Sequence, residues 1–407
     1  MKKQILTLAL AGLMTVPASA AETAMFGPGQ PIVGTPQTPV PQAGYSSAVG
    51  PVISIDEIEG RVRSDNLQIQ MMDRQLKALE DMDVSEAVNA LNTQANQLTQ
   101  LATQLQNMLP QIQDDPVTTG LITSNLAILN MQAAQLKSQA TSTTDQLDEQ
   151  IDTLEEQFHD AENQLVFAAE STYLGIKSME SSYEDLIRQR TTLATTVAEM
   201  EKRHELGQIS DIQLQETQNG LVQLDSGIST LAMNIENTKG DLNLLLGRGG
   251  KEPFTLAPLP AVTDLQIAAI NYEKDVGEVL RNSTEVRKTR DAMFDANDQD
   301  NRYTKQAAEL TYDNTVNTVR QNFLKLCRAV TDKRQLVTAA QNDFALAQQT
   351  FQSQQVKLQN GQISQNTFDA AKATMETSLN AVTTAQNNLF TAYMKYRWAM
   401  RGIVSTS

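Results

Sequence analysis

Apolar residues recur along this chain at alternating steps of three and four, a pattern typical of helices that pack side by side. In the clearest stretch they stand at seven-residue intervals, as Phe323, Val330, Val337, Phe344, Phe351 and Leu358. A second stretch runs through Val84, Val88, Leu91, Ala95, Leu98, Ala102, Leu105 and Leu109. Because such a seam is buried when two helices wrap around each other, both stretches predict coiled coils.

Further seams predict the partners of these helices. Pro110 and Asp114-Asp115-Pro116 are expected to end the 84–109 helix, and residues 122–165 return as a second helix with one local phase shift, so the two predict an antiparallel hairpin. An earlier helix, capped by Ser54 or Asp56, is expected to run unbroken to Leu79 and to stop at Asp81 and Asp83. The remaining seams consist of Leu221, Leu224, Ile228, Leu231, Ile235, Leu242 and Leu245, and of Phe368, Met375, Leu379, Val382, Leu389, Tyr393, Tyr396 and Met400.

The chain contains the same unit twice. Leu206-Gly207-Gln208-Ile209-Ser210 recurs as Asn360-Gly361-Gln362-Ile363-Ser364, each time between two long helices. Asp65-Asn66-Leu67-Gln68-Ile69 likewise resembles Asn282-Ser283-Thr284-Glu285-Val286. The helix after each Gly-Gln-Ile-Ser is expected to end about forty residues later, at Gly247 or Gly402. Since glycine takes positive φ freely, each Gly-Gln-Ile-Ser predicts a tight turn at the tip of a helical hairpin.

The N-terminus has the pattern of a secretory signal. Lys2 and Lys3 precede an apolar run from Ile5 to Val16, and Ala18-Ser19-Ala20 offers a cleavage site. The run is short for a transmembrane helix, so we expect a protein exported to the cell envelope. The expected segments are a signal peptide at 1–20, a Pro/Gly-rich linker at 21–51, a first repeat at 52–247 with an inserted hairpin at 84–165, a linker at 248–263, and a second repeat at 264–403.

Composition fits thin helical seams better than several globular cores. Only 5% of the 407 residues are aromatic, and 20% are charged. The formal net charge of -16 argues against nucleic acid as a partner, since phosphates would meet an acidic surface. The single cysteine, Cys327, excludes an intrachain disulfide and is expected to be a small core residue.

Enzymatic chemistry finds no support in the sequence, and we expect no catalytic residue, cofactor or metal. The two histidines, His159 and His204, lie in separate helices and are expected at the surface. Gly247-Arg248-Gly249-Gly250-Lys251 has the composition of a phosphate loop but lacks the following Ser or Thr and the preceding strand. A group of carboxylates that could bind a metal is better explained as the solvated face of a helix: Asp148, Glu149, Asp152, Glu155 and Glu156.

The order of these motifs resembles the TolC family of outer-membrane efflux proteins over most of residues 52–403. Each repeat of that family has a short helix near an Asn-Pro-Glu-Leu-Arg-like segment, a long helix to a Gly-x-Ile-Ser-like tip, and a return helix ending in a Leu-x-x-Leu-Leu-Gly-like segment. This sequence supplies Asn282-Ser283-Thr284-Glu285-Val286-Arg287, the two Gly-Gln-Ile-Ser tips, and Leu242-Asn243-Leu244-Leu245-Leu246-Gly247.

The resemblance implies a homotrimer whose hairpins form a hollow helical cylinder, through which substrates pass without being changed. It also implies that the tips dock onto an adaptor (membrane fusion) protein that works with an inner-membrane transporter. The alternative for the tip residues is that they only cap and turn the helices. The residues concerned are Gly207, Gln208, Ile209, Ser210, Asp211, Gly361, Gln362, Ile363, Ser364 and Asp369.

The sequence departs from the family where its members carry membrane-crossing β-strands. The first repeat has the 84–165 hairpin at that place, and in the second repeat residues 291–315 show no alternation of apolar residues. The expected fold is therefore all-α, with long antiparallel coiled-coil hairpins in two tandem repeats: a TolC-like helical-barrel protomer with the membrane β-strands missing.

Three functions remain open at this point. The first is an efflux or export conduit of the TolC type. The second is a structural or adhesive coiled-coil protein of the cell envelope without a transport role, which the missing strands and the Gln- and Asn-rich hairpin favour. The third is an adaptor-like scaffold, but the sequence shows none of the β-rich domains that should flank its hairpin.

Overall fold

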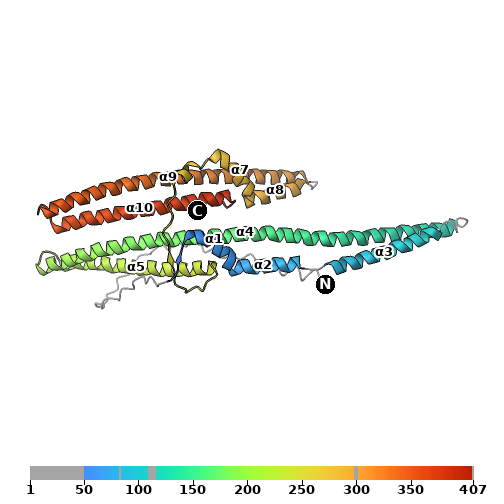
Figure 1. The fold of residues 1–407 in the computed structure, drawn as a ribbon, viewed down its shortest axis with the longest axis horizontal. Coiled ribbons are helices and arrows are strands. Elements are labelled where there is room, and N and C mark those ends of the chain that lie inside the picture. The colour runs from blue at the N-terminus through green and yellow to red at the C-terminus, as the bar shows by residue number, and fades with distance from the viewer. Residues whose placement is uncertain (1–49, 82–83, 109–115, 298–300, 406–407) are drawn as a thin grey trace. The chain divides into compact units, whose positions relative to one another are not determined.

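The computed structural model describes residues 50–81, 84–108, 116–297 and 301–405, and these are helical apart from two short strands and the connections (Figure 1). The expected signal peptide, nearly all of the 21–51 linker, and the predicted helix ends at Asp83 and 110–115 lie outside the described residues. In chain order the elements are β1 (Val52–Ile53), α1 (Ile55–Asp65), α2 (Leu67–Glu80), α3 (Ser85–Met108), α4 (Pro116–Glu205), α5 (Asp211–Leu245), β2 (Thr255–Leu256), α6 (Asp264–Ala268), α7 (Tyr272–Asn282), α8 (Thr284–Asn297), α9 (Arg302–Gln359) and α10 (Gln365–Met400).

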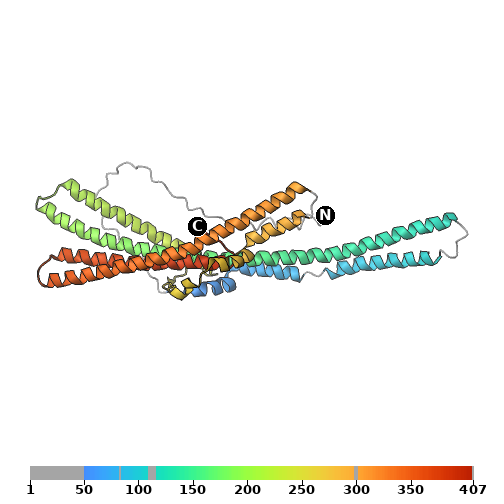
Figure 2. The same ribbon diagram turned by 90° about the horizontal axis from the view of Figure 1, so that it is seen from above.

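Three helical hairpins make up most of the fold: α3 with α4, α4 with α5, and α9 with α10 (Figure 2). The long helix α4 belongs to two of them, because it runs for 90 residues from the inserted hairpin to the first tip. The residues that the heptad pattern of α9 singles out, from Phe323 to Leu358, are all buried or half-buried, as predicted. The seam predicted for α5 is buried or half-buried as well.

The α3–α4 hairpin buries the seam that its sequence predicts. Every seam residue from Val84 to Leu105 is buried or half-buried, and the fully covered positions are alanines. These are Ala95 and Ala102 of α3 and Ala133 and Ala140 of α4. Small side chains at every seventh position let the two helices approach closely, so the leucines between them lie only half-buried at the flanks.

The prediction of one unbroken helix from residue 54 to Leu79 is wrong, because Asn66 ends α1 and begins α2. Its backbone is extended, with φ -65° and ψ 123°, and its side chain accepts hydrogen bonds from the amides of Gln68 and Ile69. Asn competes well for such capping positions, so a helix can restart here despite continuous apolar spacing. The predicted cap at Ser54 does begin α1, although its side chain makes no capping hydrogen bond to the backbone.

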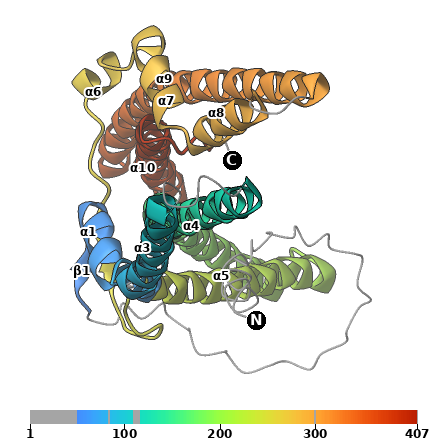
Figure 3. The same cartoon turned by 90° about the vertical axis from the view of Figure 1, so that its right-hand side faces the viewer.

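The second repeat reproduces this break at Ser283, which lies between α7 and α8 with φ -66° and ψ 118°. The helices on the two sides also match in length, since α1 and α7 each have 11 residues and α2 and α8 each have 14. Both α7 and α8 pack along α9 (Figure 3). The internal repetition predicted from the sequence therefore extends to the helix boundaries.

Each repeat closes where a glycine packs against this break. Gly247 and Gly402 have φ of 68° and 100°, and a Cβ at either would collide with a carbonyl oxygen, that of Asp65 or of Asn282. An asparagine at the break then donates its side-chain amide to the end of the last helix. Asn66 donates to the Leu245 carbonyl at 2.8 Å, and Asn282 to the Met400 carbonyl at 2.7 Å.

The two strands join the start of the first repeat to the segment between the repeats. Val52 pairs with Thr255 and Ile53 with Leu256 in parallel, so part of the linker expected at 248–263 is a strand. Tyr173 of α4 is fully buried, and its hydroxyl lies 2.8 Å from the Ala257 carbonyl oxygen and 3.2 Å from that of Ile53. This contact ties the strand pair to the long helix.

The seam predicted for α10 is wrong at one position. Leu379 is 48% exposed, whereas the neighbouring Asn380 is 8% exposed. The reason is that α10 packs on α4 as well as on α9, and the hydroxyls of Ser181 and Thr384 lie 3.0 Å apart across that second contact. A helix with two neighbours has a broader buried face than a two-helix heptad pattern describes.

None of the helices within the described residues is both long and apolar enough to span a lipid bilayer.

Two of the left-handed glycines, Gly247 and Gly207, should respond differently to alanine. At Gly247, alanine is expected to lower the free energy of unfolding by about 2 to 5 kcal/mol, because overpacking of about 1–3 kcal/mol adds to about 1–2 kcal/mol for the left-handed backbone. At Gly207, where a Cβ would meet no atom within 4 Å, only the backbone cost should remain. Urea unfolding followed by circular dichroism measures both variants. Equal losses would show that the break contact does not hold the repeat closed.

Candidate functional site

The two hairpin tips have the same backbone geometry. Gly207 has φ 70° and Gly361 has φ 69°. In the first tip the amide of Gln208 donates to the Arg203 carbonyl at 2.8 Å, and in the second the amide of Gln362 donates to the Lys357 carbonyl at 2.8 Å. This six-to-one bond after a left-handed glycine is the Schellman motif, so both glycines end a helix and reverse the chain as predicted.

A serine begins the return helix after each tip. The Ser210 side chain accepts a hydrogen bond from the Gln213 amide, and the Gln213 side chain accepts one from the Ser210 amide, which completes a capping box. Ser364 accepts from the Thr367 amide at 3.3 Å. The caps hold the turns in place from the other side, so each tip has a fixed shape.

Most predicted tip residues are exposed. Only Ile209 and Ile363 are half-buried, and open space surrounds the place where a Cβ would stand at Gly207 or Gly361. A partner protein can therefore contact the tips without displacing a side chain of this protein. The same residues form the turns and present an accessible surface.

The two acidic residues expected at the tips are not equivalent. Asp211 begins α5 and lies 2.5 Å from Nε2 of His204, so it bridges the two helices of the first tip. The residue at the same place in the second repeat is Gln365, while Asp369 lies one turn further into α10 and accepts a hydrogen bond from Gln365 at 2.9 Å. His204, which we expected at the surface, is half-buried beside this contact.

The tips of the two repeats lie at the same end of the fold. Asn366, five residues after Gly361, donates to the Glu199 carboxylate at 2.9 Å, and Glu199 stands eight residues before Gly207. Sequence reasoning did not find this contact, since it joins residues 167 positions apart. This contact brings the two tips, which are far apart in the sequence, together into one surface. We call it the composite tip surface.

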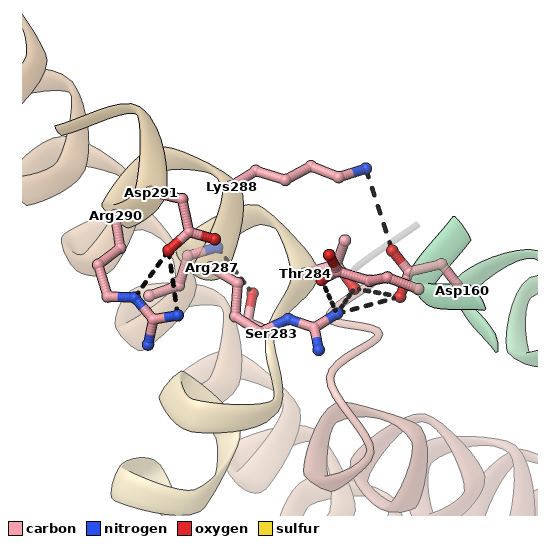
Figure 4. A network of polar contacts seen from close by, with 9 residues as sticks. Asp160, Ser283, Thr284, Arg287, Lys288, Arg290 and Asp291 are labelled. Carbon is pink, nitrogen blue, oxygen red and sulfur yellow. Dashed lines mark hydrogen bonds and ion pairs between the residues drawn. The ribbon is translucent and has the colours of Figure 1, made fainter. Parts of the chain in front are cut away.

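A second polar cluster joins α4 to α8 and was also missed (Figure 4). The Asp160 carboxylate accepts from the Thr284 hydroxyl at 2.9 Å and from Arg287 at 3.3 Å, and Lys288 lies 4.0 Å away. Arg287 also pairs with Glu156 at 3.2 Å, so part of the acidic stretch expected to face solvent contacts α8 instead. Among the described residues no group of three or more His, Cys, Asp or Glu is placed to hold a metal ion.

The only tryptophan joins the repeats through a buried carboxylate. Trp398 of α10 donates its Nε1–H to Glu170 of α4 at 2.6 Å, and both side chains are buried. Burial raises the pKa of Glu170 above its ordinary value, outweighing the hydrogen bond from Trp398. The buried site therefore favours the protonated carboxyl more than water does, although the hydrogen bond from Trp398 alone favours the carboxylate.

Comparisons with known proteins find similarity in structure alone. No family model matches the chain, and no curated protein matches it. A solved membrane protein from Pseudomonas aeruginosa is 14% identical, with a TM-score of 0.44 over 65% of this chain and 71% of its own. The outer membrane protein VceC from Vibrio cholerae is 12% identical, with a TM-score of 0.41 over 67% and 76%. CusC, described as forming a transmembrane channel, is 12% identical, with a TM-score of 0.44 over 83% and 95%.

TM-scores below 0.5 mark loose superpositions, so the fold is assigned from this chain's own elements. In both repeats a broken short helix precedes a long helix, a glycine tip and a return helix that ends at a second glycine. This is the order of a TolC-like helical protein. The recognition made from the sequence motifs is therefore confirmed at the level of the fold.

The buried Glu170 provides a pH test of the contact between repeats. Because its pKa is raised in the folded state, its contribution to stability falls as pH rises through the window between the unfolded and folded pKa values. Glu170→Gln keeps an acceptor for Trp398 and should gain stability relative to the parent as pH rises from about 4 to about 7. Glu170→Ala should lose about 1–3 kcal/mol by leaving the indole N–H unpaired.

Urea unfolding at several pH values measures these differences, with Glu216→Gln on the exposed side of α5 as the control. A Glu170→Gln profile parallel to that of the parent would contradict the buried-carboxylate assignment.

Proposed function

We propose that this protein is the conduit component of a TolC-like efflux or export system in the cell envelope. In this proposal three copies form a passive duct, and the duct docks through the composite tip surface onto an adaptor protein that serves an inner-membrane transporter. The observation that carries the proposal is the pair of tips: two turns of the same geometry, at the same end of the fold, with accessible side chains.

Exposed apolar residues on α5 support the assembly of several copies into an oligomer. Val222, Met233 and Leu244 stand eleven residues apart, and each is more than 60% exposed. Eleven residues are close to three helical turns, so these side chains form one stripe along the helix. On α9, Leu310 and Leu346 are also exposed. Exposed apolar side chains that recur on one face of a helix favour a contact with another protein, and a further copy is the partner that the duct requires.

The tip variants Gly207→Val and Gly361→Val test docking. Valine cannot take the left-handed backbone without strain, so the turn should be remodelled while the helices on both sides persist. To detect the partner, a photo-crosslinking residue is placed at Gln208 or Gln362 in the cells that produce the protein, with Leu265 of α6 as the control position.

The proposal expects both tip positions to crosslink to the same adaptor and the control position not to do so. In the valine variants the yield of crosslinked product should fall by at least about nine tenths, which corresponds to a loss of more than about 1.4 kcal/mol of binding free energy. Full retention of that product in the valine variants would remove the tips from the docking surface. If neither tip reaches an adaptor while both reach other envelope components, the structural or adhesive coiled-coil function replaces the conduit.

A further inference from the structure

The first repeat carries a helical hairpin that the second lacks. Arg302, the first residue of α9, lies 59 residues before Gly361, and Asp148 lies 59 residues before Gly207. Four residues join α8 to α9 in the second repeat, whereas residues 81–147 fill the corresponding place in the first. The inserted segment consists of α3 and the part of α4 before Asp148, and we call it the extra hairpin. Among the described residues, the tip turns and the polar contacts between the repeats given above involve none of its side chains.

The extra hairpin has almost no charge. Among its described helical residues up to Thr144, only Glu86 and Lys137 are charged, and the exposed positions are mostly Gln, Asn, Ser and Thr. The next stretch of α4, from Asp145 to Glu162, is strongly acidic: Asp145, Asp148, Glu149, Asp152, Glu155, Glu156, Asp160 and Glu162. The change at Asp145 lies within three residues of the boundary of the extra hairpin at Asp148.

Apolar side chains are nevertheless exposed on the outside of the extra hairpin. Leu101 of α3 is 49% exposed, and Ile128 and Met131 of α4 are 44% and 65% exposed. Ile128 and Met131 are three residues apart and so share a helix face. All three lie in the half of the hairpin nearer its turn, while the seam between α3 and α4 fully buries only alanines. The pair of helices therefore leaves much of its apolar surface uncovered.

We propose that the extra hairpins of separate copies of this chain pack against one another through their exposed apolar residues Leu101, Ile128 and Met131. Charge decides in favour of a second copy. In a protein of net charge -16, an uncharged surface is where identical chains can meet without bringing like charges together, and the acidic stretch from Asp145 limits the contact to the hairpin.

Other occupants fit this surface less well. A charged partner would find no complementary charges. A lipid surface would meet amide side chains without the Lys and Arg that membrane-bound helices carry on their polar face. Helices of the same kind can cover the apolar residues and pair their Gln and Asn side chains with each other. The proposal does not depend on the duct, because it concerns a contact remote in sequence from both tips.

Cysteine crosslinking of the mature chain, residues 21–407, tests the contact. The native Cys327 is buried, and burial, with a further contribution from Asp275, raises the pKa of its thiol to about 11, so the background should be low. Met131→Cys and Leu101→Cys are each treated with a bis-maleimide, and covalent oligomers are counted on denaturing gels. Leu265→Cys on α6, which is 83% exposed, is the matched control.

The proposal expects oligomers from Met131→Cys or Leu101→Cys at a yield at least tenfold above the control. It also expects Ile128→Glu, added to either variant, to reduce that yield at least tenfold with helicity unchanged. A yield no higher than the control for both cysteines, or one that Ile128→Glu does not lower, would overturn it. Negative-stain images of the same samples distinguish the failure of the hairpin contact from the failure of the proposed duct. Rings that persist without hairpin crosslinks would contradict the hairpin contact alone.

Discussion

The contact between a left-handed glycine and the carbonyl at a helix break holds each repeat together. The break, at Asn66 or Ser283, belongs to the first helices of a repeat, and the glycine, Gly247 or Gly402, to its end. The close backbone approach leaves no room for a Cβ, and an asparagine amide caps the last helix across the same contact. Since the two ends of the repeat meet there, the length of the long helices alone determines how far the tip extends from it.

Both polar and apolar contacts join the two repeats. Trp398 reaches Glu170, Arg287 reaches Asp160, and Arg401 pairs with Glu59 at 3.0 Å. One apolar core also spans both repeats, because Phe390, Met394 and Trp398 of α10 belong to the same buried cluster as Tyr173 and Ile176 of α4. Glu170 is the buried one of these three acidic residues, so its substitution should disturb the contact between the repeats.

The sequence predicts what depends on neighbours close in the chain. Heptad spacing is such a property, and the predicted seams of α3, α5 and α9 were confirmed for that reason. The positive φ of the tip glycines was confirmed as well, because only glycine takes it freely. The helix break at Asn66 was missed because the apolar spacing continues across it and its partner, Leu245, lies 179 residues away. The exposure of Leu379 and the pairing of Asp160 with α8 likewise depend on which helices pack side by side.

The same distinction between local and long-range contacts applies to the candidate tip site. Both turns could be predicted from Gly-Gln-Ile-Ser, because the glycine and serine act on their own backbone. Their meeting in one surface could not, since it depends on the pairing of Asn366 with Glu199. Asp369, the acidic residue predicted for the second tip, does not occupy the position of Asp211, because the residue directly after the serine is Gln365.

The central claim is that this chain works as an assembled hollow duct. The most direct measurement is the mass of the chain without its expected signal peptide, residues 21–407, by light scattering after size exclusion without detergent, together with negative-stain images of the same fraction. We expect a trimer with a central opening. A stable elongated monomer at every concentration would contradict the duct.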